Sequence, residues 1–194
     1  YCLSCHSAAY MRYNRMSEDL QIPKEVVEDN MMFAADRIGG LMKTSMPEED
    51  AKKWFGKAPP DLSLVARSRG PEWLYTYLRG FYLDDTSPSG WNNTLFPKVA
   101  MPHVMYSLQG ARDAIFKKDE NGVEVFDHYE MVKPGSLNEE EFDSAMRDLT
   151  NFMVYLAEPA RLVRYKLGVY VLIFLAIFFV FAYLLKKEYW KDVH

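Results

Sequence analysis

Cysteine is scarce in this chain of 194 residues, which contains only Cys2 and Cys5. Two cysteines exclude a disulfide-rich scaffold, and a bridge between residues this close would form a very small, strained loop. The four histidines show no paired spacing that would complete a zinc site beside the cysteines. A βαβ pattern, which a thioredoxin-like redox pair requires, is not visible around them either.

Positive charge is not in excess. The chain has 23 Lys/Arg against 27 Asp/Glu, a net charge of −4. Residues 161–194 carry 6 Lys/Arg against 2 Asp/Glu, which leaves residues 1–160 with a net charge of −8. An acidic part of this kind argues against nucleic acid as a partner and favours a basic protein.

What the chain does contain is Cys2-Leu3-Ser4-Cys5-His6, which has the Cys-x-x-Cys-His pattern of c-type haem attachment. Two thiols at this spacing can each form a thioether with a haem vinyl group. The adjacent His6 is then carried beneath the porphyrin, where its imidazole can bind the iron. We therefore predict one covalently attached haem c, held by Cys2 and Cys5 and ligated by His6.

The sequence begins one residue before Cys2, and no signal-peptide pattern is visible in the residues present. A helix normally leads into such a motif, so we expect an N-terminal segment to be missing from this sequence. Covalent attachment of haem c implies assembly on the outer side of a bacterial or organellar inner membrane. We therefore expect the haem-binding part to lie outside that membrane.

The first half of the chain is predicted to be mostly helical, with a rigid extended stretch at Pro59-Pro60-Asp61-Leu62-Ser63. The first predicted helix is residues 23–37, which begins at Pro23 and is stopped by Gly39-Gly40. A short helix ending near Gly56 is predicted from a capping-box pattern of Ser45 and Glu48 around Pro47. A third helix starts at Pro71, with Leu74, Leu78 and Phe81 on one side.

Residues 84–100 are rich in Asp, Ser, Pro, Gly and Asn and are predicted to form a long loop. Residues 111–133 contain two apolar stretches around Asn121-Gly122, which is a turn signal, and are predicted to form a small β-hairpin. The sequence suggests no role for this hairpin.

A helix is predicted after the hairpin, with Asn138 as its N-cap and Glu141 at the third helical position. Leu137 and Phe142 are placed to form a hydrophobic staple, and Pro159 ends the helix. The fold class is therefore mainly α, with a small β-hairpin.

The last feature is an uncharged apolar run of 19 residues, 167–185. As a helix it would span about 28 Å, close to the thickness of a bilayer's hydrocarbon core. Lys186-Lys187 and Trp190 follow it as interfacial anchors. Three basic residues flank the run on each side, so charge alone does not set the orientation. Because the haem must lie outside, we expect the short C-terminal tail to be cytoplasmic.

A second axial ligand has three candidates, Met101, His103 and Met105. Met101 lies in a loop bounded by prolines rather than on a helical face. A thioether favours ferrous iron and raises the reduction potential, which suits an electron carrier. His103 is a stronger donor two residues later and remains a rival, and Met105 is a third choice.

Several motifs in order resemble the cytochrome c1 family, the haem subunits of the cytochrome bc1 complex, over nearly the whole chain. They are Cys2-x-Ser4-Cys5-His6-Ser7, Pro59-Pro60-Asp61-Leu62-Ser63, Arg67, Met101 with Tyr106, and Ala157-Glu158-Pro159 before the apolar run. The match is loose between residues 17 and 56. The family often has a small residue and prolines after its methionine, whereas this chain has Pro102-His103.

The resemblance implies a class I cytochrome c-like haem domain within a dimeric quinol–cytochrome c oxidoreductase, beside cytochrome b. The domain would take electrons from the Rieske iron–sulfur protein and pass them to a soluble c-type cytochrome. By position, Cys2 and Cys5 would hold the haem, and His6 and Met101 would ligate its iron. Pro60 would accept a hydrogen bond from His6, and Leu62 would pack on the porphyrin ring. Arg67 would pair with a haem propionate, although Arg69 is an equal candidate by composition.

The implied domain organisation has three parts. Residues 1–160 form the periplasmic haem domain, residues 161–185 a juxtamembrane segment and single membrane span, and residues 186–194 a cytoplasmic tail. Two other functions remain open from the sequence. One is a stand-alone membrane-anchored cytochrome c that serves another oxidase or reductase, and the other is a haem-based sensor or peroxidase.

Overall fold

The computed structural model describes residues 1–192. Its contacts divide the chain into two units, Tyr1–Ala157 and Glu158–His194. In the first unit the helices are α1 (Tyr13–Leu20), α2 (Lys24–Asn30), α3 (Glu48–Phe55), α4 (Val65–Arg69), α5 (Pro71–Arg79), α6 (Tyr106–Gln109) and α7 (Glu139–Ala157). The strands are β1 (Ala8–Arg12), β2 (Leu41–Met42), β3 (Phe81–Leu83), β4 (Trp91–Asn93), β5 (Gly110–Lys118) and β6 (Glu124–Pro134).

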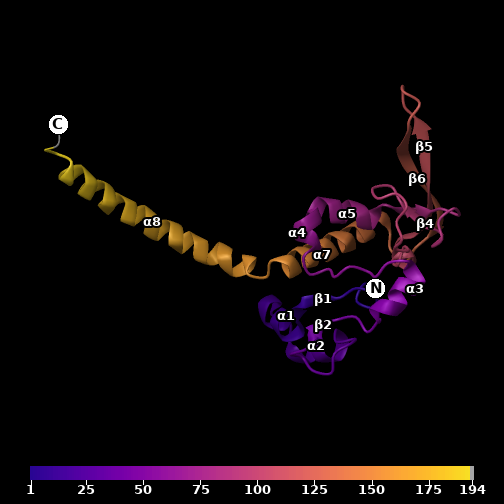
Figure 1. The fold of residues 1–194 in the computed structure, drawn as a ribbon, viewed down its shortest axis with the longest axis horizontal. Helices are drawn as coiled ribbons and strands as arrows, with labels where there is room; N and C mark the ends of the chain where they lie inside the picture. Colours follow the sequence, from indigo (N-terminus) through magenta and orange to yellow (C-terminus); the bar gives the residue numbers. More distant parts are fainter. Residues whose placement is uncertain (193–194) are drawn as a thin grey trace. The chain divides into compact units, whose positions relative to one another are not determined.

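The first unit is helix-rich, and its strands form three separate antiparallel pairs, β1–β2, β3–β4 and β5–β6. Helix α7 packs against both α4 and α5, and Figure 1 shows these three helices side by side. Apolar residues of α7 contribute to all three buried clusters of the unit: Leu156 to one, Met153 and Ala157 to the second, and Phe142 and Met146 to the third.

The helix predicted over residues 23–37 is shorter than expected, because α2 ends at Asn30. Asp29 and Asn30 compete with the helical backbone for hydrogen bonds and are weak helix formers. The chain turns after Met31, and the following apolar side chains pack instead against the cluster around Val27. The helical period of these side chains therefore reflected tertiary packing rather than one continuous helix.

Three further details differ from the prediction. Ser45 does not cap α3, because Pro47 occupies the N-cap in extended conformation and no side chain bonds there. Phe81 does not belong to α5; it begins β3 and is completely buried. The predicted loop over residues 84–100 contains β4, which pairs back with β3. The turn-rich composition concealed this short strand, which buried Asn93 stabilises through a bond to the carbonyl oxygen of Tyr77.

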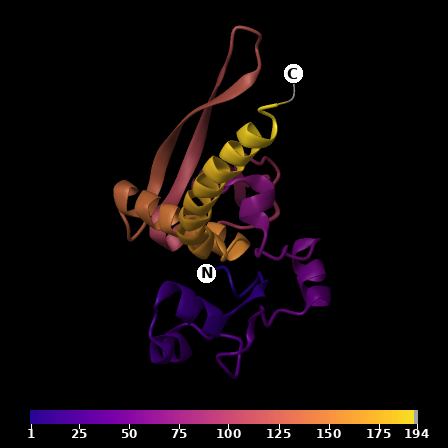
Figure 2. The ribbon, with the colours of Figure 1, turned by 90° about the vertical axis from the view of Figure 1, so that its left-hand side faces the viewer.

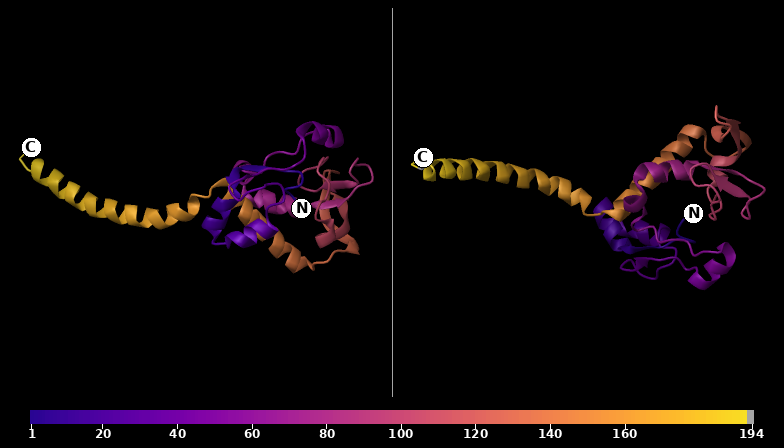
Figure 3. Two further views of the ribbon diagram at one scale, coloured as in Figure 1. Left: turned by 90° about the horizontal axis from the view of Figure 1, so that it is seen from below. Right: turned by 45° about the horizontal axis from the view of Figure 1, so that its top comes forward.

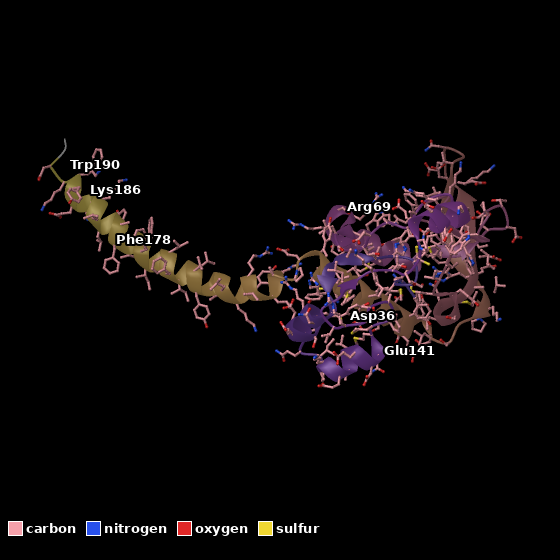
Figure 4. All side chains as sticks on the ribbon, turned by 60° about the horizontal axis from the view of Figure 1, so that its bottom comes forward. Asp36, Arg69, Glu141, Phe178, Lys186 and Trp190 are labelled. Carbon is pink, nitrogen blue, oxygen red and sulfur yellow. The ribbon has the colours of Figure 1, made fainter. Side chains whose placement is uncertain are left out.

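The predicted hairpin is confirmed as β5 and β6, joined by a turn with Gly122 at positive φ. Figure 2 shows this hairpin extending from the rest of the unit. The capping box of α7 is also confirmed: the backbone N–H of Glu141 donates to Asn138 Oδ1 at 3.0 Å, and that of Asn138 donates to Glu141 Oε2 at 3.0 Å. Glu141 is labelled in Figure 4.

The second unit contains α8 (Arg161–Tyr189), a single helix of 29 residues. It is long and apolar enough to cross a membrane, and none of its side chains is buried against the described residues. Figure 3 shows its gentle curvature, and Figure 4 shows Phe178, Lys186 and Trp190 projecting from its surface. The predicted fold class, a mainly α unit with a hairpin and one apolar C-terminal helix, is confirmed.

Candidate haem site

Residues 2–6 form a tight turn. The backbone N–H groups of Cys5 and His6 both donate to the carbonyl oxygen of Cys2, at 3.1 and 2.8 Å. Both thiols are free and half-buried. Burial raises the pKa of the Cys2 thiol, whereas a redox-active cysteine needs a lowered pKa to be a thiolate. The raised pKa of Cys2 therefore argues against a role in thiol–disulfide exchange.

His6 is held in one tautomer. Its Nδ1 lies 2.7 Å from the carbonyl oxygen of Pro60. A carbonyl oxygen only accepts, so Nδ1 carries the proton and donates it to this bond. The other ring nitrogen, Nε2, then keeps its lone pair, which is the form of imidazole that binds a metal.

An open apolar cavity lies beside this ring. Cys2, Cys5 and His6 line this cavity, together with Pro59 and Pro60. The remaining lining residues are Tyr1, Phe55, Lys57, Ala58, Ala100, Met101, Pro102 and Val104. The cavity therefore combines a nitrogen donor and a thioether with apolar walls.

A second apolar cavity shares Cys2 with the first. Leu62 lines it, together with Leu149, Phe152 and Met153 of α7. A large flat apolar group bound beside Cys2 would therefore meet apolar lining residues of both cavities.

The three candidate axial ligands lie in different surroundings. Met101 lines the first cavity, and the hydroxyl of Tyr77 donates to its Sδ at 3.4 Å. His103 is 2% exposed, and its ring stacks on Phe81 with centroids 5.0 Å apart. Met105 is 1% exposed and belongs to a core cluster. Among the described residues, only Met101 of these three lines the cavity that His6 lines.

His103 is instead part of the protein interior. Its ring also meets Trp91 edge to face, with centroids 5.0 Å apart. Burial, with a further contribution from the charge of Arg112, lowers the pKa of His103 to about 4. The ring is therefore neutral near pH 7 and packs as an aromatic side chain.

Arg67 lies outside both cavities. It is exposed on α4 and lines neither of them. Arg69 is also exposed, and its guanidinium lies over the ring of Trp73 at 5.0 Å. The structure therefore brings together Cys2, Cys5, His6, Pro60, Leu62 and Met101, and it leaves Arg67 apart from them.

Sequence reasoning missed several residues of the site, among them Tyr77 and Phe55. Tyr77 approaches Met101 from α5, and burial raises the pKa of its hydroxyl to about 12. Phe55, the last residue of α3, lines the first cavity. Neither residue belongs to a motif, and only its place in the fold brings it to the site.

The residues present fit a c-type haem. Two thiols, a histidine Nε2 with a free lone pair and a methionine thioether line apolar space. Residues 1–192 contain no group of three His, Cys, Asp or Glu placed to hold a metal ion.

Comparison with known proteins gives a family match along the chain. The model of the cytochrome C1 family matches residues 1–193. The chain is 50% identical to cytochrome c1 of Allochromatium vinosum, covering 100% of this chain and 80% of that protein. It is 45% identical to a protein of Nitrosomonas europaea named ammonia monooxygenase gamma subunit, covering 100% and 79%. It is 26% identical to cytochrome b/c1 of Bradyrhizobium diazoefficiens, covering 100% of this chain and 32% of that protein.

Proposed function

The chain belongs to the cytochrome c1 family, and from that premise we propose that it carries electrons from a Rieske iron–sulfur protein to a soluble basic c-type cytochrome. Membership makes it an electron-transfer haem subunit of a bc1-type quinol–cytochrome c reductase, a complex that also contains cytochrome b. We further propose that the working complex is a dimer.

One haem c is proposed to bind in the first cavity. Cys2 and Cys5 would form its thioethers, and His6 Nε2 and Met101 Sδ would bind its iron. The haem supplies an iron that cycles between ferrous and ferric states. The observation that carries this assignment is the bond from His6 Nδ1 to Pro60, which leaves Nε2 free beside a cavity that Met101 also lines.

The protein's own contribution is to keep His6 and Met101 in place as the two iron ligands. The Pro60 carbonyl fixes the orientation of the His6 ring and increases its basicity. Apolar residues around Met101 exclude water and competing ligands, and the thioether favours the ferrous state. Leu62 is proposed to pack on the ring and Arg67 to pair with a propionate.

Members of this family are membrane-anchored, and α8 provides one apolar helix of sufficient length. We propose that residues 1–160 lie in the periplasm and that residues 161–185 lead into and across the inner membrane. The tail, residues 186–194, would be cytoplasmic; residues 193–194 of it lie outside the described residues. Lys186, Lys187 and Trp190 would sit at the membrane interface.

Copurification tests the proposed complex. The full chain, solubilised in mild detergent, is expected to purify with a b-type haem and a Rieske cluster in the same particle. A particle that contains neither would favour a stand-alone membrane cytochrome. Purification with monooxygenase subunits, the assembly named for the Nitrosomonas relative, would also overturn the proposal. Carbon monoxide binding to the reduced protein at neutral pH would favour a sensor or peroxidase.

The basic acceptor is proposed from the charge of residues 1–160, which is −8. Attraction between exposed opposite charges is screened over about 8 Å at physiological ionic strength. The second-order rate of electron transfer to a basic cytochrome should therefore fall as salt is added. A rate that does not change with ionic strength would remove the electrostatic part of this proposal.

A further inference from the structure

The segment that carries Pro60 is tied to the chain just after His6. Three backbone N–H groups form the connection between residues 7–10 and residues 61–63. They are Leu62 N–H to the carbonyl oxygen of Ser7 at 2.7 Å, Ala9 N–H to Asp61 Oδ2 at 2.9 Å, and Tyr10 N–H to Ser63 Oγ at 3.1 Å.

Asp61 has a special place among these contacts because its carboxylate bonds in two directions. Oδ2 accepts from Ala9, on the strand that follows His6, and Oδ1 accepts from the N–H of Ser63 at 2.8 Å. Burial alone would raise the pKa of Asp61, but its hydrogen bonds with Ser63 and Ala9 outweigh burial and lower it. The group is therefore an ionised double acceptor at neutral pH.

The Pro60 carbonyl belongs to the peptide unit that joins Pro60 to Asp61. That carbonyl oxygen accepts the proton of His6 Nδ1 at 2.7 Å. Because a peptide unit is planar and rigid, any displacement of the Asp61 backbone also displaces the acceptor of this bond. The Asp61 carboxylate thus fixes the position of the Pro60 carbonyl oxygen through the covalent geometry of the backbone, without touching it.

We propose that Asp61 is a positioning residue for the haem iron ligand, which holds the Pro60 carbonyl against His6 Nδ1 by clamping residues 61–63 to residues 9–10. This inference rests on the proposed function, since it takes His6 as the ligand. Its consequence is that Asp61 controls the strength of the His6–Pro60 hydrogen bond, and with it the basicity of the imidazole.

A simpler electrostatic role is the alternative, in which the negative charge of Asp61 alone affects the iron. Two substitutions separate the roles. Asp61→Asn removes the charge and one acceptor, whereas Asp61→Glu keeps the charge but moves the carboxylate by one methylene. Asp36→Asn is the matched control, because it removes a charge from an exposed side chain (Figure 4).

The test uses the full haem-loaded chain in detergent. NMR follows the exchange of the His6 Nδ1 proton with deuterated solvent, and redox titration gives the midpoint potential. We expect exchange about tenfold faster in both Asp61→Asn and Asp61→Glu, because the bond to Pro60 is weakened. Asp36→Asn should exchange at the wild-type rate.

Two results would overturn the positioning role. One is an exchange rate within twofold of wild type in both Asp61 variants. The other is faster exchange in Asp61→Asn alone, with Asp61→Glu like wild type, which assigns the effect to charge. If Asp61→Asn fails to retain haem, Asp61→Glu decides by itself. A wild-type chain without covalent haem would instead refute the proposed function.

Discussion

The two sides of the proposed haem cavity are built differently. On the His6 side, the ligand and its supports lie within short, contiguous segments joined by backbone hydrogen bonds. On the Met101 side, the thioether lies in a loop, and Tyr77 reaches it from a separate helix. The next residues of that loop are held by the protein interior, through the stacking of His103 on Phe81.

This difference separates the residues that hold the haem from the residues that adjust its reduction potential. The first side has fixed donors and acceptors, so a change there should affect whether and how the haem is held. The second side depends on packing, so a change there should alter the potential and the access of other ligands while the haem stays bound. Substitutions on the two sides should therefore have different effects.

Replacing both Cys2 and Cys5 by Ala should have the largest effect. Without thioethers, no haem should remain on the chain after denaturation, because only covalent attachment survives loss of the fold. Haem staining of the denatured chain on a gel measures this directly. Full haem staining of the double variant would show that the haem is attached elsewhere, and it would contradict this division between the two sides.

Met101→Leu should keep the covalent haem but lower the midpoint potential by on the order of 0.1 V, since loss of the thioether removes a ligand that favours ferrous iron. The reduced variant should also bind carbon monoxide. Met105→Leu is the control: Met105 lies in the core, so its replacement should cost less than about 1.5 kcal/mol of stability and leave the potential unchanged. The reverse pattern would identify Met105 as the ligand.

Tyr77→Phe should lower the potential by a smaller amount. Its hydroxyl donates to Met101 Sδ at 3.4 Å, and losing this bond makes the thioether a better donor to ferric iron. A hydrogen bond worth about 1 kcal/mol corresponds to roughly 40 mV for one electron. Tyr75→Phe, on the same helix, is the control and should give the wild-type potential in the same redox titration. A rise in potential for Tyr77→Phe would contradict this account.

Arg67→Gln should have the smallest effect, because Arg67 is exposed and its charge is screened. Removal of a positive charge near a propionate stabilises the ferric state, so the potential should fall by roughly 10–20 mV. Arg69→Gln, which removes an equal charge from the same helix, should not produce this shift. Equal shifts in both variants would show that Arg67 has no specific partner.

The sequence predicts the His6 side of the site better than the Met101 side, and the reason is physical. Cys2, Cys5 and His6 form one local motif whose spacing alone carries the chemistry. The extended conformation of the proline-rich segment also follows from proline's fixed φ angle. The clamp by Asp61, in contrast, depends on a pairing with Ala9 that only the fold creates.

The other side illustrates what local patterns leave out. Met101, His103 and Met105 alternate in a loop, so their spacing cannot say which one faces the cavity. The structure places His103 and Met105 in the interior through contacts with Phe81 and Phe142, which come from distant parts of the chain. The early end of α2 and the strand β4 were missed for other reasons: Asp29 and Asn30 weaken the end of the helix, and a turn-rich composition conceals the short pairing of β3 with β4.

The most direct test of the central claim is the far-red absorption of the oxidised protein, where a bond between sulfur and iron gives a weak band. We expect this band in the wild type and in Met105→Leu, and its loss in Met101→Leu with covalent haem still present. A band that survives in Met101→Leu and disappears in Met105→Leu would contradict the ligand assignment. A wild type without the band, in which His103→Ala opens the iron, would show bis-histidine ligation instead.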